Sequence, residues 1–136
     1  MPKETNYWAL LADPGTYGWN DLIREKRAAW DGIRNARAQS NLTKCAQGDL
    51  ALIYHTAPDK AVMGIAKVVR TAYPDPSDDT RVVIDVEPVK PLKRPLPLAD
   101  MKADATLADM SFVRMPRVAV QPVTPKQWER VLKLGG

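Results

Sequence analysis

The pattern of apolar and polar positions predicts a series of short elements. Tyr7–Leu11 is an aromatic and aliphatic run that ends at a turn sequence, which is typical of a buried strand. Leu50–Tyr54 and Val62–Arg70 are rich in aliphatic residues and predict two strands joined by a hairpin loop at Ala57–Lys60. Gly64 interrupts the second of these strands, so we expect a bulge or a close approach of another group there.

Prolines set the expected limits of the later strands. Tyr73–Ser77 contains two prolines, and because proline cannot donate to a sheet we expect a loop. Arg81–Glu87 alternates enough for a third strand of a meander, and the prolines within residues 88–97 are expected to end it. Two further short strands are predicted at Phe112–Val113 and Val118–Val120.

Helix start signals occur at several points between these strands. Asn20 is the predicted cap of a brief helix that ends near Lys26, and Asp31 is the predicted cap of a second helix that runs to Asn41. The remaining helical segments are predicted at Leu98–Met101, at Leu107–Met110 and from Thr124-Pro125 to just before Gly135. About five or six strands and four short helices, without βαβ alternation, indicate an α+β fold with a curved or barrel-like sheet flanked by helices.

The segment Trp30–Asn35 combines an indole, a carboxylate, a glycine, a guanidinium and a carboxamide. If a helix begins at Asp31, Trp30 presents a ring face at a helix N-terminus, where free N–H groups favour anionic ligands. Arg34 can then bind phosphate and Asn35 can read a hydrogen-bonding edge, so the segment suits a planar ligand such as a nucleobase. The alternative remains open that Trp30 is a core residue and that Asp31-Gly32 is an ordinary turn.

Five runs of the chain resemble, in the same order, the EVE domain family. They are YWALLADP from Tyr7, WDGIRNARAQSNL from Trp30, GDLALIYH from Gly48, GIAKVVRTAYPDP from Gly64 and VRMPRVAVQPVTPKQW from Val113. The resemblance extends from Tyr7 to Leu132. It implies one domain over residues 1–136 with a PUA-like fold, a small mixed β-barrel of about five or six strands flanked by short helices.

The resemblance also implies which residues bind a ligand. Trp30 and Asn35 occupy the matching WDG-x-RN motif and are expected to stack on a base and to read its edge, with Trp30 at the rim of the pocket. The other expected lining residues are Trp19, Tyr54, His55 and Asp13, where Asp13 replaces the glutamate usual in the family. Independently of the resemblance, the basic residues that we expect to contact the nucleic acid backbone are Arg34, Arg37 and Arg114.

Composition excludes several classes of protein. The 136 residues suit one ordinary domain, and a net charge of +4 with a pI near 9.3 permits binding to nucleic acid. The single histidine excludes a cluster of histidine metal ligands, and no phosphate-binding glycine loop or nucleophile elbow occurs, so we expect no metal, no cofactor and no enzymatic activity. Cys45 is alone and cannot form an internal disulfide.

No apolar run is long enough to cross a membrane, and no signal peptide is evident, so we expect a cytoplasmic protein, or a nuclear one in a eukaryote. The predicted function is non-enzymatic binding of nucleic acid that carries a modified base, with modified cytosine in DNA first and RNA second. One alternative is a protein that binds a small molecule or nucleotide in the same cavity, with or without catalysis. Another is a protein-interaction module whose aromatic residues all belong to the core.

Overall fold

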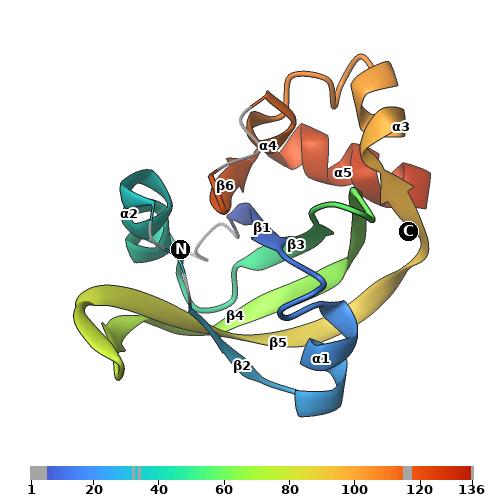
Figure 1. Cartoon of the computed structure of the whole chain (residues 1–136). Helices are drawn as coiled ribbons and strands as arrows, with labels where there is room; N and C mark the ends of the chain where they lie inside the picture. Colours follow the sequence, from blue (N-terminus) through green and yellow to red (C-terminus); the bar gives the residue numbers. More distant parts are fainter. Residues whose placement is uncertain (1–5, 32, 34, 115–117, 136) are drawn as a thin grey trace.

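The structure, a computed structural model, describes residues 6–31, 33, 35–114 and 118–135 (Figure 1). Six strands and five helical segments lie within these residues, and none of the helices is long and apolar enough to cross a membrane. In chain order the elements are β1 (Tyr7–Ala12), α1 (Trp19–Glu25), β2 (Ala28–Trp30), α2 (Ala36–Lys44), β3 (Leu50–His55), β4 (Ala61–Asp75), β5 (Asp78–Pro97), α3 (Leu98–Ala103), α4 (Ser111–Arg114), β6 (Val120–Val123) and α5 (Pro125–Gly135).

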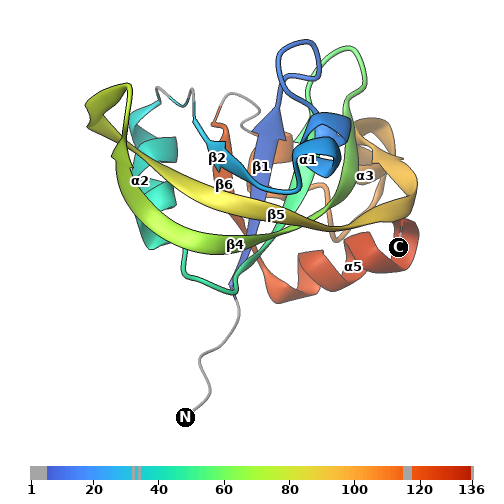
Figure 2. The same ribbon diagram turned by 90° about the horizontal axis from the view of Figure 1, so that it is seen from below.

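The six strands form one mixed and strongly curved sheet (Figures 1 and 2). Their order is β2-β5-β4-β3-β1-β6, in which β1 and β3 are parallel and the other neighbours are antiparallel. Helix α2 contacts both β6, at one edge, and β5, next to the other edge, so it bridges the two ends of the curved sheet. The predicted α+β class with five or six strands is confirmed.

Strand β1 has a buried core on each of its faces. Trp8 and Leu10 pack with side chains of α1 and α2, whereas Ala9 and Leu11 pack with side chains of α3 and α5. Successive residues of a strand point to opposite faces, which is why a continuous apolar run can serve both cores. The burial of a large aliphatic side chain such as Leu10 contributes about 1.5–3 kcal/mol.

Strands β4 and β5 are much longer than the sequence predicts. The expected loop at 73–77 is wrong, because β4 runs to Asp75, and the expected strand end at Pro88 is wrong, because β5 runs to Pro97. Strand β2 pairs only with the residues of β5 from Ile84 to Val86, so the proline-rich part of β5 has one unpaired edge. Proline is tolerated on such an edge because no partner requires its missing N–H, and several register shifts between β4 and β5 absorb the remaining irregularity.

Helix α2 begins four residues later than expected, at Ala36. The predicted cap Asp31 is wrong: the carboxamide of Asn35 accepts the N–H groups of Arg37 at 2.9 Å and Ala38 at 3.1 Å. Residues 28–30 form strand β2 instead, and Ile33 is buried in the core. Asp and Asn are similar helix caps, so local sequence alone does not choose between them.

Several other boundaries differ from the predictions. Helix α1 is preceded by Gly18, not capped by Asn20, and the segment expected to be helical at 107–110 is a turn. Residues 112 and 113, expected in a strand, belong to α4, and the last strand begins at Val120. Short apolar runs fit a strand or a helix equally well, and tertiary packing decides between them.

Gly64 lies directly beneath the indole of Trp19, which is 4% exposed. A Cβ added at Gly64 would lie 2.4 Å from Cζ2 of that ring. The strand also changes register between Val62 and Gly64. Both parts of the expectation for Gly64, a bulge and a close approach, are confirmed.

We predict that Gly64→Ala lowers the free energy of unfolding by about 1–3 kcal/mol, because the buried Trp19 ring must move to admit the methyl group. Gly15→Ala is the matched control, since its Cβ would meet only Oδ1 of Asp13, at 3.3 Å. Urea denaturation measures both variants. Equal stability of the two would contradict the close packing of Trp19 on Gly64.

We predict that Asn35→Ala costs about 1 kcal/mol of stability because α2 loses its cap, and that Asn35→Asp costs much less. Asn20→Ala is the control, since Asn20 lies within α1 and does not cap it. Thermal unfolding of the three variants measures the difference. A loss for Asn20→Ala as large as that for Asn35→Ala would contradict the assigned caps.

Candidate functional site

A cavity of about 670 Å³ opens between the end of β1, strand β2 and the chain before β6. Its volume is in the range usual for small-ligand sites. It is lined by Leu11, Ala12, Asp13, Thr16, Tyr17, Glu25, Arg27, Ala28, Ala29, Trp30, Asp31, Ile33 and Ala119. Two segments make most of the wall: the end of β1 with the loop that follows it, and β2 with the residues on either side of it. Ala119, just before β6, completes the lining.

The buried part of the lining is apolar and contains an aromatic corner. Leu11, Trp30 and Ile33 are each less than a tenth exposed. The rings of Tyr17 and Trp30 lie nearly perpendicular, with centroids 6.1 Å apart and planes at 85°. A flat ligand can therefore stack on one of the two rings while its edge faces the other.

The hydroxyl of Tyr17 is buried and lies near the carboxylate of Glu25, but it makes no hydrogen bond of normal length and angle with any described residue. Burial, and secondly the negative charge of nearby Glu25, raise the pKa of Tyr17 to about 12. The hydroxyl is therefore neutral at pH 7 and can donate a hydrogen bond. A buried polar group without a partner is costly, so it is a natural contact point for a bound ligand.

The exposed rim of the cavity is mostly acidic. The carboxylates of Asp13, Glu25 and Asp31 line it, against the single described cation Arg27. Asp13 is partly occupied, because it accepts from the N–H of Gly15 at 2.9 Å and from the hydroxyl of Thr16 at 3.3 Å. Such a rim favours ligand edges that donate hydrogen bonds, such as an exocyclic amine, and disfavours a phosphate inside the cavity.

Arg27, which directly precedes β2, is held at this rim by a network that extends to strands β5 and β4. Asp85, which is 7% exposed, accepts from Nη2 of Arg27 at 3.0 Å and from the hydroxyl of Tyr73 at 2.5 Å. The hydrogen bond to Asp85 is the main cause that raises the pKa of Tyr73. The guanidinium of Arg70 lies 3.7 Å from the centroid of the Tyr73 ring, in cation–π contact.

Two of the residues expected to form the pocket, Trp30 and Asp13, line the cavity. Trp30 is not a rim residue, however, because it is 6% exposed and belongs to the core cluster with Trp8 and Leu10. Its truncation to alanine would remove core packing at a cost of about 3–5 kcal/mol, which is much more than the expected position at the rim implies.

The other expected lining residues lie elsewhere. The carboxamide oxygen of Asn35 caps α2, the ring of Trp19 covers Gly64, and Tyr54 is buried in the core that contains α5. His55, 6% exposed, lies between Asp59 and the backbone of Trp19, and neither of its ring nitrogens reaches the cavity lining.

The expected phosphate contacts have mixed outcomes. Arg37 is exposed in the first turn of α2 and Arg114 is exposed at the end of α4, and neither lines the cavity. Arg34 lies outside the described residues.

Three residues that line the cavity were not predicted from the sequence: Tyr17, Glu25 and Arg27. The signal for Tyr17 was its position between Gly15 and Gly18, since loops often carry the residues that bind a ligand.

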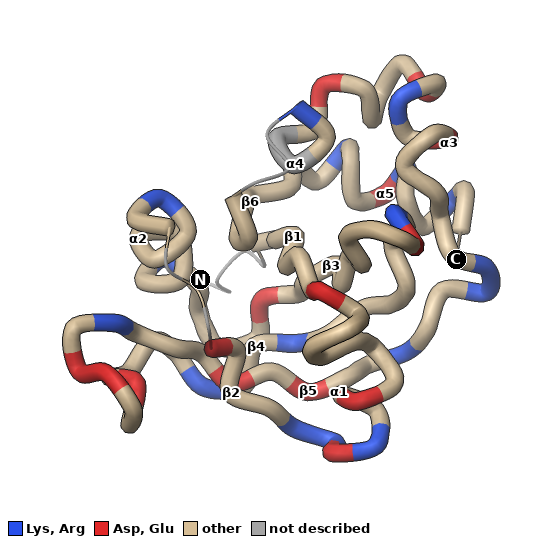
Figure 3. The backbone as a smooth tube through the Cα atoms, in the orientation of Figure 1, with Lys and Arg blue, Asp and Glu red and all other residues tan. Residues whose placement is uncertain are grey.

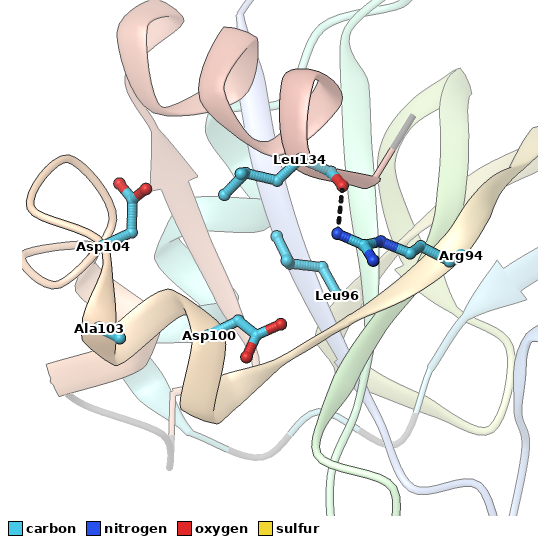
Figure 4. Close-up of a pocket in the computed structure, with 6 residues that line it drawn as sticks. All are labelled: Arg94, Leu96, Asp100, Ala103, Asp104 and Leu134. Atoms are coloured by element: carbon cyan, nitrogen blue, oxygen red, sulfur yellow. Dashed lines mark hydrogen bonds between the residues drawn. The ribbon is translucent and has the colours of Figure 1, made fainter.

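A second and smaller hollow, of about 240 Å³, lies between the end of β5, α3 and α5 (Figure 4). The guanidinium of Arg94, which lines this hollow, donates to the carbonyl of Leu134 at 3.5 Å. Asp104, on its opposite side, accepts from Nη2 of Arg130 at 2.7 Å, and this pairing lowers the pKa of the Asp104 carboxyl. No aromatic ring lines it, so the larger cavity is the candidate site.

Other reactive groups of the described residues do not form a site. No three His, Cys, Asp or Glu side chains in this part of the chain are grouped so as to hold a metal ion. Burial raises the pKa of Cys45 to about 12, so its thiol is protonated and unreactive at pH 7.

Comparisons of the sequence and of the structure with known proteins point to the same family. Human thymocyte nuclear protein 1 is 29% identical over an alignment 166 positions long, gaps included. The alignment covers 96% of this chain and 74% of the human protein. The NMR structure of Rpa0253 from Rhodopseudomonas palustris is 38% identical with a TM-score of 0.92, over 97% of this chain and 94% of that one.

A crystal structure of human THYN1 protein in complex with 5-methylcytosine containing DNA has a TM-score of 0.87 at 24% identity, over 96% of this chain and 97% of that one. These structures confirm the predicted α+β, PUA-like fold. A family model described as the EVE domain matches residues 6–134. The chain belongs to the EVE domain family.

Proposed function

We propose that this protein binds a modified cytosine in DNA, and catalyses no reaction on it, by taking the extruded base into the cavity beside Tyr17 and Trp30. The observation that carries the proposal is the combination of an apolar, aromatic floor with a rim of carboxylates. The structure of human THYN1 with 5-methylcytosine containing DNA supports it, because that protein has the same fold.

The lining matches the two ends of a methylated cytosine. The ring and its methyl group are apolar and suit contact with Trp30, Ile33 and Leu11. The exocyclic amine donates hydrogen bonds, and carboxylates such as Glu25 at the rim accept them, as they do in other cytosine contacts. The same rim argues against one form of the small-molecule alternative, a negatively charged metabolite inside the cavity, because the carboxylates would repel it.

Energy sets limits on this mode of binding. Stacking contributes about 1–3 kcal/mol per base, whereas extrusion of a base from a duplex costs a few kcal/mol. Hydrogen bonds at the rim and contacts to the DNA backbone must supply the difference. A methyl group in an apolar pocket adds only about 1–3 kcal/mol of discrimination, so the preference for the modified base should be about tens-fold.

Charge outside the cavity is available for the backbone contacts. Lysine and arginine residues occur along α2, near the C-terminal end of β5 and on α5, whereas acidic residues gather at the turn between β4 and β5 (Figure 3). Arg27 is exposed at the rim of the cavity, and Arg37 is exposed in the first turn of α2. We infer that phosphates contact the surface around the rim while the base alone enters.

The direct test is titration of the protein with short oligonucleotides that differ only in one cytosine, either plain or 5-methylated, at two salt concentrations. We predict binding to both, weakened by salt, with the methylated form bound about tenfold or more tightly at each concentration. Equal affinity for the two forms would reduce the interaction to charge alone and would contradict the proposal. A matched RNA series tests the second nucleic acid.

Tyr17→Phe gives a residue-level test, because it removes only the unpartnered hydroxyl. We predict that the variant binds the methylated oligonucleotide about fivefold more weakly and is at least as stable as the wild type. Tyr7→Phe is the control, since Tyr7 stacks on Trp128 away from the cavity. Unchanged affinity of Tyr17→Phe would exclude a hydrogen bond from this hydroxyl to the ligand.

A further inference from the structure

The loop from Asp13 to Gly18 carries Tyr17 into the cavity, and the loop is held at both ends. At its start, the carbonyl of Asp13 accepts the N–H groups of Thr16 at 3.0 Å and Tyr17 at 2.8 Å. At its end, Gly18 and the first residue of α1, Trp19, meet the side chain of His55 at the end of β3. His55 is the only histidine of the chain.

The hydrogen bonds of His55 determine its tautomer. Its Nε2 accepts the backbone N–H of Trp19 at 2.8 Å, so Nε2 must have a free lone pair. The proton of the neutral ring is therefore on Nδ1, which donates to Oδ2 of Asp59 at 2.9 Å. Asp59 thus orients the ring, and the ring in turn holds the backbone at the start of α1.

Packing leaves this part of the loop little freedom. His55 is 6% exposed, and a Cβ added at Gly18 would lie 3.1 Å from its Nε2, so this edge of the imidazole lies close to the Gly18 backbone. The end of β3 is itself tied to β1, because Thr56 donates its N–H to the carbonyl of Ala12 at 2.9 Å. Tyr17 immediately precedes Gly18, and a shift of that backbone would move its ring away from Trp30.

We propose that His55 and Asp59 are positioning residues of the cavity: they fix Tyr17 against Trp30 without touching the ligand. The predicted effect of these residues on ligand binding rests on the proposed function, whereas their predicted effect on the position of the loop does not. His55 was expected in the pocket from the sequence. Its contacts instead assign it an indirect role through the backbone of Gly18 and Trp19.

The first test is spectroscopic and needs no ligand. With one histidine in the chain, long-range ¹H–¹⁵N NMR spectra report the tautomer of His55 without ambiguity. We predict a neutral ring protonated on Nδ1 at pH 7.5. A ring protonated on Nε2 would overturn the proposal, because it could not accept from Trp19.

The second test compares Asp59→Ala with Asp59→Asn, since the asparagine oxygen can still accept from Nδ1. Asp79→Ala is the matched control, because it makes the same change of charge at an exposed residue near the start of β5. We predict that Asp59→Ala weakens binding of the methylated oligonucleotide about fivefold relative to this control, and that Asp59→Asn restores most of the loss.

The same variants are examined for nuclear Overhauser contacts between the rings of Tyr17 and Trp30. We predict that Asp59→Ala weakens these contacts and that Asp59→Asn retains them. Unchanged contacts and unchanged binding in Asp59→Ala would overturn the proposal, as would equal losses in both Asp59 variants. If the wild-type protein binds none of the oligonucleotides, the proposed function fails, and the ring contacts alone then decide whether His55 and Asp59 position the loop.

Discussion

The burial of Trp30 connects the fold with the site. Strand β2 is only three residues long, yet its pairing with β5, in which Trp30 lies opposite Ile84, brings the indole into the core. The part of the ring that the core does not cover forms the floor of the cavity, where it meets the edge of Tyr17. One side chain thus stabilises the sheet edge and presents an aromatic surface, so the cavity cannot change shape without a cost to the core.

The floor and the rim have separate physical roles. The floor is apolar and rigid because its residues belong to the core, which suits contact with the face of an aromatic ring. The rim is acidic although the chain has a net charge of +4, so the charge that attracts a polyanion lies outside the cavity. In the proposed mode of binding, this division separates general attraction to the DNA backbone from discrimination between bases.

The sequence predicted most strands of the central sheet, because a buried strand leaves a visible pattern in its own residues, either an alternation of apolar and polar positions or a continuous apolar run. It failed where the outcome depends on distant partners. The prolines of β5 are tolerated only because β2 is too short to pair with them, and the cap of α2 is Asn35 only because the core takes up Trp30 and Ile33. Neither fact is present in the local residues.

The candidate site shows the same limit. Trp30 and Asp13 were found because they lie in motifs, whereas Tyr17, Glu25 and Arg27 reach the cavity through the path of the loop and the end of α1. His55 has an unusual residue type for a strand end, but only the structure shows that it acts on the backbone.

The most direct measurement is a crystal structure of this protein with a short DNA strand that contains one 5-methylcytosine. We predict that the base lies within the cavity, in contact with Trp30 and Tyr17, with its exocyclic amine toward the carboxylates of the rim. The phosphates of the strand should lie outside the cavity. A base bound on another face, with the cavity empty, would contradict it.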